Sequence, residues 1–138
     1  MNELSRFVKA QEGCFDQALA EIRAGRKRTH WMWFIFPQLA GLGFSPTARF
    51  YAIMNLDEAQ RYLADPVLGP RLTEITQVLL GLSSRNARAI FGYPDDLKLR
   101  SSMTLFSQVS GCSPVFAQVI DEFFDGQPDR ATLTLLGS

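Results

Sequence analysis

The sequence has few of the residues that most directly reveal a chemistry. Its single histidine and two cysteines cannot complete the usual zinc sites, and it contains no C-x-x-C pair. Gly41 and Gly43 do not fit a dinucleotide-binding or phosphate-binding loop, and Thr47 stands where a nucleophile elbow needs its second glycine. The sequence therefore indicates no metal and no cofactor, and it leaves open whether a reaction is catalysed.

Long apolar runs and an excess of one charge are lacking too. The longest apolar run, 31–36, is far shorter than the roughly 20 residues of a membrane helix, and charged residues interrupt the N-terminal segment. We therefore expect no membrane span, no signal peptide and a cytoplasmic protein with two free thiols. Lys and Arg number 14, as do Asp and Glu, and this zero net charge speaks against nucleic acid as a partner.

What the sequence does have is enough apolar residues for a core. Hydrophobic residues make up 46% of the 138 residues, a proportion typical of a folded globular protein and not of a disordered chain. No repeat or low-complexity linker interrupts it. We predict one domain over residues 1–138.

Helical periodicity and capping residues recur along the chain. Ser45-Pro46 and Ser113-Pro114 are helix starts, Asn55 with Glu58 resembles a capping box, and Asp129 is a further cap. No segment alternates as a half-exposed strand does, and only the run 31–36 could be either a helix or a buried strand. The predicted fold is all-α, with seven to nine helices over or within these segments: 12–24, 31–36, 46–53, 55–63, 65–82, 86–91, 96–109, 114–125 and 129–135.

The first segment that could carry chemistry is 27–33. A basic run that ends in Lys27 and Arg28 precedes His30, which lies next to Trp31 and close to Trp33. Histidine is the side chain that most often serves as acid or base near neutral pH, and tryptophan offers a flat wall for a ring or a cation. Composition alone favours the plainer interpretation, in which both tryptophans belong to the core and the basic run complements a helix C-terminus.

The second such segment is 93–104. Two carboxylates, two cations and three hydroxyls lie within one turn and the helix that follows. Helical spacing places Asp96, Arg100 and Thr104 on one face, and Lys98 near Ser101. Such a face could bind an anion or a polar ring, but it is equally typical of a solvated helix surface with ordinary ion pairs.

Both segments resemble the signatures of an uncharacterised bacterial family, domain of unknown function 1810. The first signature is KRTHWMWFIFPQLAGLG at 27–43, and the second is GYPDDLKLRSSMTLF at 92–106. Residues 51–53, 58–63 and 65–72 also fit, so the resemblance covers nearly the whole chain. It implies a multihelical fold and assigns no role to any residue.

Some members of that family carry the label calpastatin, a protease inhibitor. Inhibitors of that type resemble disordered, repeat-containing chains rich in proline and lysine. This sequence has a core's worth of Phe, Leu, Ile and Trp and no repeats, so it argues against the label.

Two functional hypotheses follow. In the first, segments 27–43 and 93–104 form a site for a small anionic or nucleotide-like ligand. Its predicted acids and bases are His30, Asp95 and Asp96, in a pocket that contains His30 within reach of the 95–100 turn. Its predicted ligand-binding residues are Lys27, Arg28, Trp31, Trp33, Gln38, Lys98, Arg100, Ser101 and Thr104.

In the second hypothesis the domain is a protein-interaction module without chemistry. Aromatic side chains and arginine are common at the centres of interfaces. This hypothesis predicts a flat apolar patch near 31–36 and no concave polar pocket. We favour the ligand site, because long polar signatures on turns serve binding more often than packing.

Overall fold

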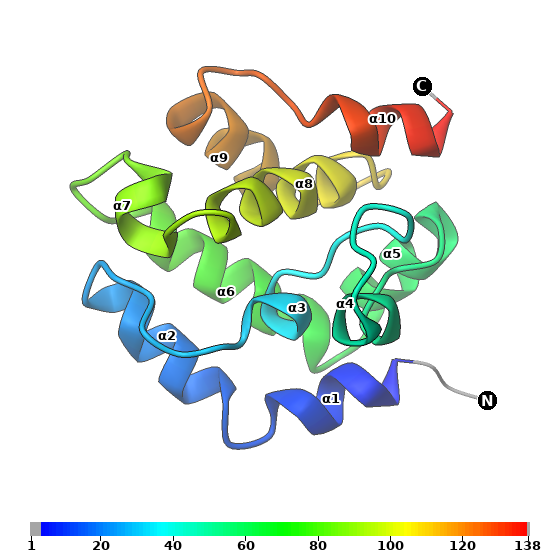
Figure 1. Ribbon diagram of the computed structural model, residues 1–138, viewed down its shortest axis with the longest axis horizontal. Coiled ribbons are helices and arrows are strands. Elements are labelled where there is room, and N and C mark those ends of the chain that lie inside the picture. The colour runs from blue at the N-terminus through cyan, green and yellow to red at the C-terminus, as the bar shows by residue number, and fades with distance from the viewer. Residues whose placement is uncertain (1–3, 138) are drawn as a thin grey trace.

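The computed structural model describes residues 4–137 as an array of helices around one hydrophobic core (Figure 1). The helices, in chain order, are α1 Ser5–Gln11, α2 Phe15–Arg23, α3 Met32–Ile35, α4 Pro46–Phe50, α5 Leu56–Ala64, α6 Leu68–Leu80, α7 Ala87–Phe91, α8 Asp95–Ser107, α9 Val115–Phe123 and α10 Arg130–Leu136. The predicted all-α class is confirmed.

These ten helices of the described residues exceed the seven to nine expected, and the additional one is α1. The run 31–36, for which helix and strand were both open, forms the short helix α3. The predicted start of a helix at residue 12 was early, because Gly13, with φ of 72°, separates α1 from α2. Only a single parallel bridge, between Leu39 and Ile53, has strand character within 4–137.

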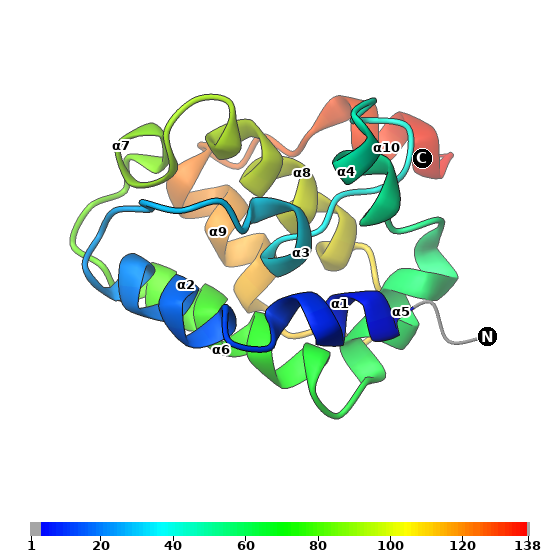
Figure 2. The same cartoon turned by 60° about the horizontal axis from the view of Figure 1, so that its bottom comes forward.

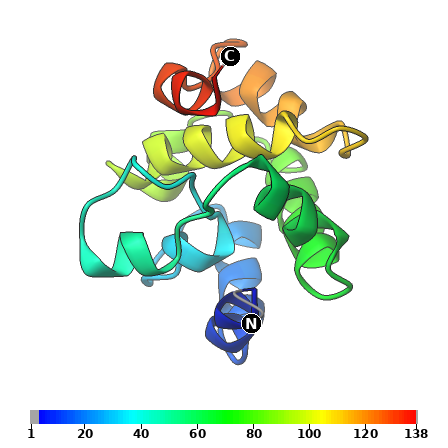
Figure 3. The same cartoon turned by 90° about the vertical axis from the view of Figure 1, so that its right-hand side faces the viewer.

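Helix α8 is the centre of the fold. It packs against α5, α7, α9 and α10, and α6 packs against α2, α5 and α9 (Figures 1 and 2). The residues 101–106 of α8 are all buried, which is why its serines and threonines lie inside the protein and not on a solvated face. Figure 3 shows the 36–54 segment, with α4, to one side of α8.

Several helix ends have the side-chain caps that the sequence predicts. Ser45 Oγ accepts a hydrogen bond from the Ala48 amide at 3.1 Å, and Asn55 Oδ1 accepts one from the Glu58 amide at 2.9 Å. Asp129 Oδ2 accepts the Thr132 amide at 3.0 Å. Each cap satisfies an N–H group that the first turn of a helix leaves unpaired.

Helices α5 and α6 approach each other closely at Gly69. A Cβ atom at this position would lie 2.1 Å from the Leu63 carbonyl oxygen, so a larger residue does not fit. The close approach fixes how α6 packs on α5, and α5 in turn packs against the central helix α8.

Candidate functional site

The two signature segments meet in space at Asp95, the first residue of α8. Lys27 Nζ lies 2.8 Å from Asp95 Oδ2, and Lys98 Nζ lies 3.3 Å from Asp95 Oδ1. A backbone bond joins the same regions, because the Lys27 amide donates to the Ile90 carbonyl at 2.7 Å. One carboxylate therefore holds a lysine from each segment.

Each of these lysines also faces a tryptophan. Lys27 Nζ is 5.2 Å from the centre of the Trp31 ring, and Lys98 Nζ is 5.2 Å from that of Trp33. The Lys27 side chain is only 7% exposed, whereas that of Lys98 is 26% exposed. Of the two ammonium groups, Lys98 is thus the one available to a ligand, and Lys27 is part of the support behind it.

The segment that leads into Trp31 is held by Glu21, a buried carboxylate of α2. Its oxygens accept hydrogen bonds from the Arg28 amide at 2.7 Å and the Thr29 amide at 3.0 Å. They also accept from Thr29 Oγ1 at 2.7 Å and from Trp31 Nε1 at 2.9 Å. Burial by itself would raise the pKa of Glu21, but these donors, with Gln17, outweigh it and hold the pKa well below its usual range.

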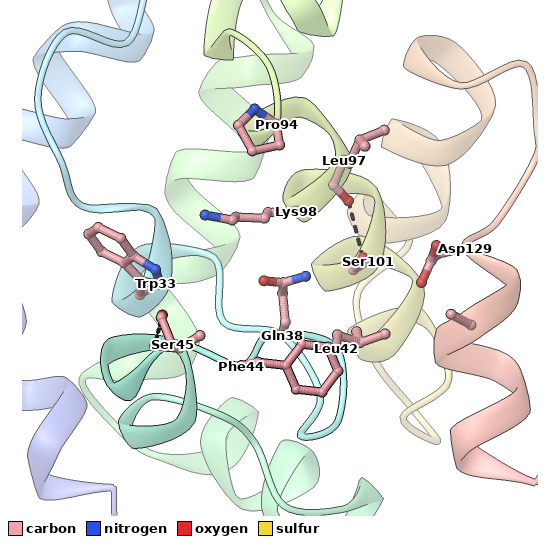
Figure 4. Close-up of a pocket in the computed structure, with 13 residues that line it drawn as sticks. Trp33, Gln38, Leu42, Phe44, Ser45, Pro94, Leu97, Lys98, Ser101 and Asp129 are labelled. Carbon is pink, nitrogen blue, oxygen red and sulfur yellow. Dashed lines mark hydrogen bonds between the residues drawn. The ribbon is translucent and has the colours of Figure 1, made fainter.

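A pocket of about 370 Å³ opens between the 38–48 segment, the first turns of α8 and the start of α10 (Figure 4). The volume is at the small end of the range typical of ligand pockets, roughly 300–1,000 Å³. Its walls are mainly apolar and its polar side chains are few. The lining residues are Trp33, Gln38, Leu42, Gly43, Phe44, Ser45, Ala48, Pro94, Leu97, Lys98, Ser101, Asp129 and Ala131.

The polar side chains of the pocket are spread across it. Figure 4 shows Lys98 beside Trp33 on one side, Asp129 on the other, and Gln38 and Ser101 between them. Ser101 Oγ donates to the Leu97 carbonyl at 3.1 Å. The Gln38 amide group forms no hydrogen bond with the part of the chain that the structure describes, so its donor and acceptor are both open to a ligand.

Four of the predicted ligand-binding residues, Trp33, Gln38, Lys98 and Ser101, line this pocket together. Lys27 reaches it only through Asp95. Thr104 is fully buried beneath it, and its Oγ1 accepts the Asp129 amide at 2.9 Å.

The other three predicted ligand-binding residues lie elsewhere. Trp31 is 2% exposed and belongs to the core, so it offers no face to the pocket. The Arg28 side chain is exposed and only its backbone serves Glu21. Arg100 donates from Nε to the Gln127 carbonyl at 2.7 Å. Its guanidinium carbon Cζ lies 5.9 Å from the centre of the Phe124 ring.

His30 does not line the pocket. It is exposed at a bend between two residues that donate to Glu21: Thr29 through its backbone amide, and Trp31 through its side-chain Nε1. The expected pocket that contains His30 within reach of the 95–100 turn is therefore not the pocket found here.

The two predicted catalytic carboxylates point in different directions. Consecutive helical residues are about 100° apart around the axis, so Asp95 and Asp96 do not share one site. Asp96 is 6% exposed and lies 3.4 Å from Arg88 Nε in a separate, shallow concavity that Phe124 also lines. Asp95 anchors the ammonium groups of Lys27 and Lys98, and neither Asp95 nor Asp96 lines the pocket.

Sequence reasoning missed Glu21, Phe44 and Asp129. Phe44 is 72% exposed at the mouth of the pocket. Two signals in the sequence could have indicated the first two residues. Glu21 is an acidic residue close to the apolar stripe of 12–24, and Phe44 is an aromatic residue in a glycine-containing loop. Asp129 was identified as a cap but not as a residue of a site.

Residues 4–137 show neither a cluster of metal-ligating side chains nor a membrane-spanning helix. No group of three or more His, Cys, Asp or Glu side chains there could hold a metal ion. None of the helices of this range has the length and apolar character needed to cross a membrane.

The comparisons with known proteins agree with the resemblance seen in the sequence. The chain is similar to the crystal structure of the conserved hypothetical protein Rv1873 from Mycobacterium tuberculosis, with 48% identity and a TM-score of 0.96. The similarity covers 99% of this chain and 97% of that chain. A comparison with curated proteins finds no match. The family described as "Protein of unknown function (DUF1810)" matches residues 1–136, and the chain therefore belongs to the DUF1810 family.

Proposed function

We propose that this protein binds a small, nucleotide-like ligand in the pocket between the 38–48 segment, α8 and α10. The observation that carries the proposal is the position of Lys98, whose ammonium is fixed by Asp95 and Trp33 at the edge of a pocket wall that both signatures build. A lysine ammonium has more N–H donors than Asp95 engages, so Lys98 can also donate to an acceptor or anionic group of a ligand.

The aromatic contact of this ligand falls to Phe44. One face of the Trp33 ring is already occupied by the Lys98 ammonium, and Trp31 is in the core. The Phe44 ring is 72% exposed at the pocket, so covering it with a flat ring would remove apolar surface from water. The proposal therefore replaces tryptophan stacking with stacking on Phe44.

The proposal concerns binding and assigns no reaction. His30 and Asp96 stand outside the pocket, and Asp95 acts by positioning Lys98. The cytoplasmic location expected from the sequence stays part of the proposal, and the two unpaired cysteines fit a reducing compartment.

A thermal-unfolding screen tests the proposal directly. Purified protein is heated with nucleosides, nucleotides, sugar phosphates and small carboxylic acids. A compound at 100 times its dissociation constant adds about 2.7 kcal/mol to the free energy of unfolding. For a domain of this size that raises the melting temperature by on the order of 10 °C.

The matched variants are Lys98→Met and Lys9→Met. Both remove one ammonium and keep a long apolar side chain, but Lys9 is exposed on α1, whereas Lys98 lines the pocket. We expect Lys98→Met to weaken binding of a hit by at least about tenfold, the loss of one charge-assisted hydrogen bond, while Lys9→Met leaves it unchanged. A screen without hits, or a hit that both variants bind equally, would contradict the proposal.

The second candidate, a protein-interaction module, has one observation in its favour. Phe50, Met54 and Leu135 are each more than half exposed. However, four side chains of the 31–36 run, on which that hypothesis was built, are buried: Trp31, Met32, Ile35 and Phe36. Binding of a small molecule through Lys98 discriminates between the two candidates.

A further inference from the structure

Asp129 lies across the pocket from Lys98 (Figure 4), and its carboxylate is only half engaged by the protein. Its Oδ2 atom accepts the Thr132 amide at 3.0 Å and Thr132 Oγ1 at 2.6 Å. No group of residues 4–137 donates to its Oδ1 atom. One oxygen therefore caps α10, and the other is left for a partner from outside the chain.

The position of this carboxylate is fixed before any ligand arrives. The Asp129 amide donates to Thr104 Oγ1 at 2.9 Å, and Thr104 is fully buried in the central helix α8. Thr132, in the first turn of α10, donates both of the hydrogen bonds that Oδ2 accepts. A side chain held at both its backbone and its far end loses little freedom on binding, which is the requirement for selective recognition.

A ligand that covers the Asp129 carboxylate must satisfy this oxygen. Covering a carboxylate oxygen without giving it a donor removes its contact with water and costs more than a neutral group would. A ligand with a hydroxyl or an N–H group on that side avoids the cost, and one with a phosphate there adds repulsion between like charges.

We propose that Asp129 determines the specificity of the pocket: it selects a nucleoside-like ligand that donates a hydroxyl or N–H to Oδ1, and it excludes polyanions. Among the lining residues, Lys98 and Asp129 are the charged pair, and their charges cancel. The ligand then carries at most one phosphate group, placed at Lys98, with its donors at Asp129. This inference rests on the proposed function. It narrows the ligand class from nucleotide-like molecules in general to nucleoside-like molecules that are not polyanions.

The test compares each ribonucleoside with its 5′-monophosphate, its 5′-triphosphate and its 2′,3′-dideoxy form. Dissociation constants are measured by calorimetry with the wild-type protein. We expect the ribonucleoside or the monophosphate to bind at least tenfold more tightly than the triphosphate. We also expect the dideoxy form, which lacks the two ribose hydroxyl donors, to bind at least tenfold more weakly than its parent.

Asp129→Asn then changes the charge while it keeps the helix cap, because asparagine caps helices about as well as aspartate. The matched control is Asp125→Asn, in the same loop, where the left-handed backbone with φ of 54° also suits asparagine. The preference for ribonucleoside over triphosphate should fall at least tenfold in Asp129→Asn and stay unchanged in Asp125→Asn. If Asp129→Asn melts well below the control, Asp129→Ser provides a second cap without the charge.

The outcomes separate this inference from the proposed function. If binding depends on Lys98 but the ranking of ligands is the same in wild type, Asp129→Asn and Asp125→Asn, the role of Asp129 is refuted and the pocket assignment stands. If the triphosphate binds most tightly to the wild type, the inference is refuted as well. If none of the series binds the wild type, the nucleotide-like ligand and the role of Asp129 fall together.

Discussion

Replacing Glu21 with glutamine should destabilise the protein far more than a surface substitution of the same kind. Glu21 is 3% exposed and accepts hydrogen bonds from Arg28, Thr29 and Trp31. A glutamine has the same shape, but it has only one acceptor oxygen and sets an NH2 group against donors that now lack a partner. Hydrogen bonds to a charged acceptor contribute roughly 1.5–3 kcal/mol each, so we expect the free energy of unfolding to fall by about 2–4 kcal/mol.

The assay is urea unfolding at neutral pH followed by tryptophan fluorescence, with Glu12→Gln as the control because Glu12 is exposed between α1 and α2. Ligand affinity should fall as well in Glu21→Gln, since the Trp31 ring and the Lys27 ammonium over it lose a support. Equal stability of the two variants would refute the role of Glu21 as the anchor of the 28–31 segment.

The role of the Glu21 carboxylate can also be tested through the pH dependence of the free energy of unfolding. The pKa of Glu21 is lowered in the folded protein, so its stabilisation is complete above the unfolded value of about 4.3 and is lost as the pH falls towards the folded value. Glutamine does not titrate. The stability difference between wild type and Glu21→Gln should therefore shrink below about pH 4. A difference that stays constant down to pH 2 would show that the charge has no part in the anchor.

Three further predictions concern packing and thiol chemistry. Gly69→Ala should lower the free energy of unfolding by more than about 2 kcal/mol, measured in urea, because its Cβ would lie 2.1 Å from a backbone oxygen of Leu63. Gly43→Ala should weaken ligand binding severalfold with a smaller loss of stability, because its Cβ would lie 2.6 Å from the Ala48 Cβ at the pocket wall and the exposed helix α4 can shift. Burial raises the pKa of Cys112, so iodoacetamide at pH 8 should alkylate it more slowly than a small-molecule thiol, as mass spectrometry of the peptides will show.

The helices were predictable because their signals are local. The caps at Ser45, Asn55 and Asp129 and the buried positions 68, 72, 75 and 79 follow from spacing along one segment. Helix α1 was not predicted, because the apolar residues of Ser5–Gln11 are too few to show a period.

The candidate site was predictable only in part, because it depends on contacts between distant segments. Spacing correctly associates Lys98 with Ser101, since both lie on one helix. It cannot show that Glu21 takes up the donors of Trp31, or that the exposed His30 lies outside the pocket. Nor can it separate Asp95 from Asp96, because which neighbour points inward depends on how α8 is rotated in the fold.

The shared carboxylate of Asp95 also links the pocket to the segment behind it. Lys98 and Lys27 each hold one of its oxygens. A ligand that draws the Lys98 ammonium towards itself leaves Asp95 more fully to Lys27, whose amide is bonded to the Ile90 carbonyl. Occupancy of the pocket is then transmitted to the junction of the 27–31 segment with α7, where the Lys27 amide should exchange its hydrogen more slowly when ligand is bound.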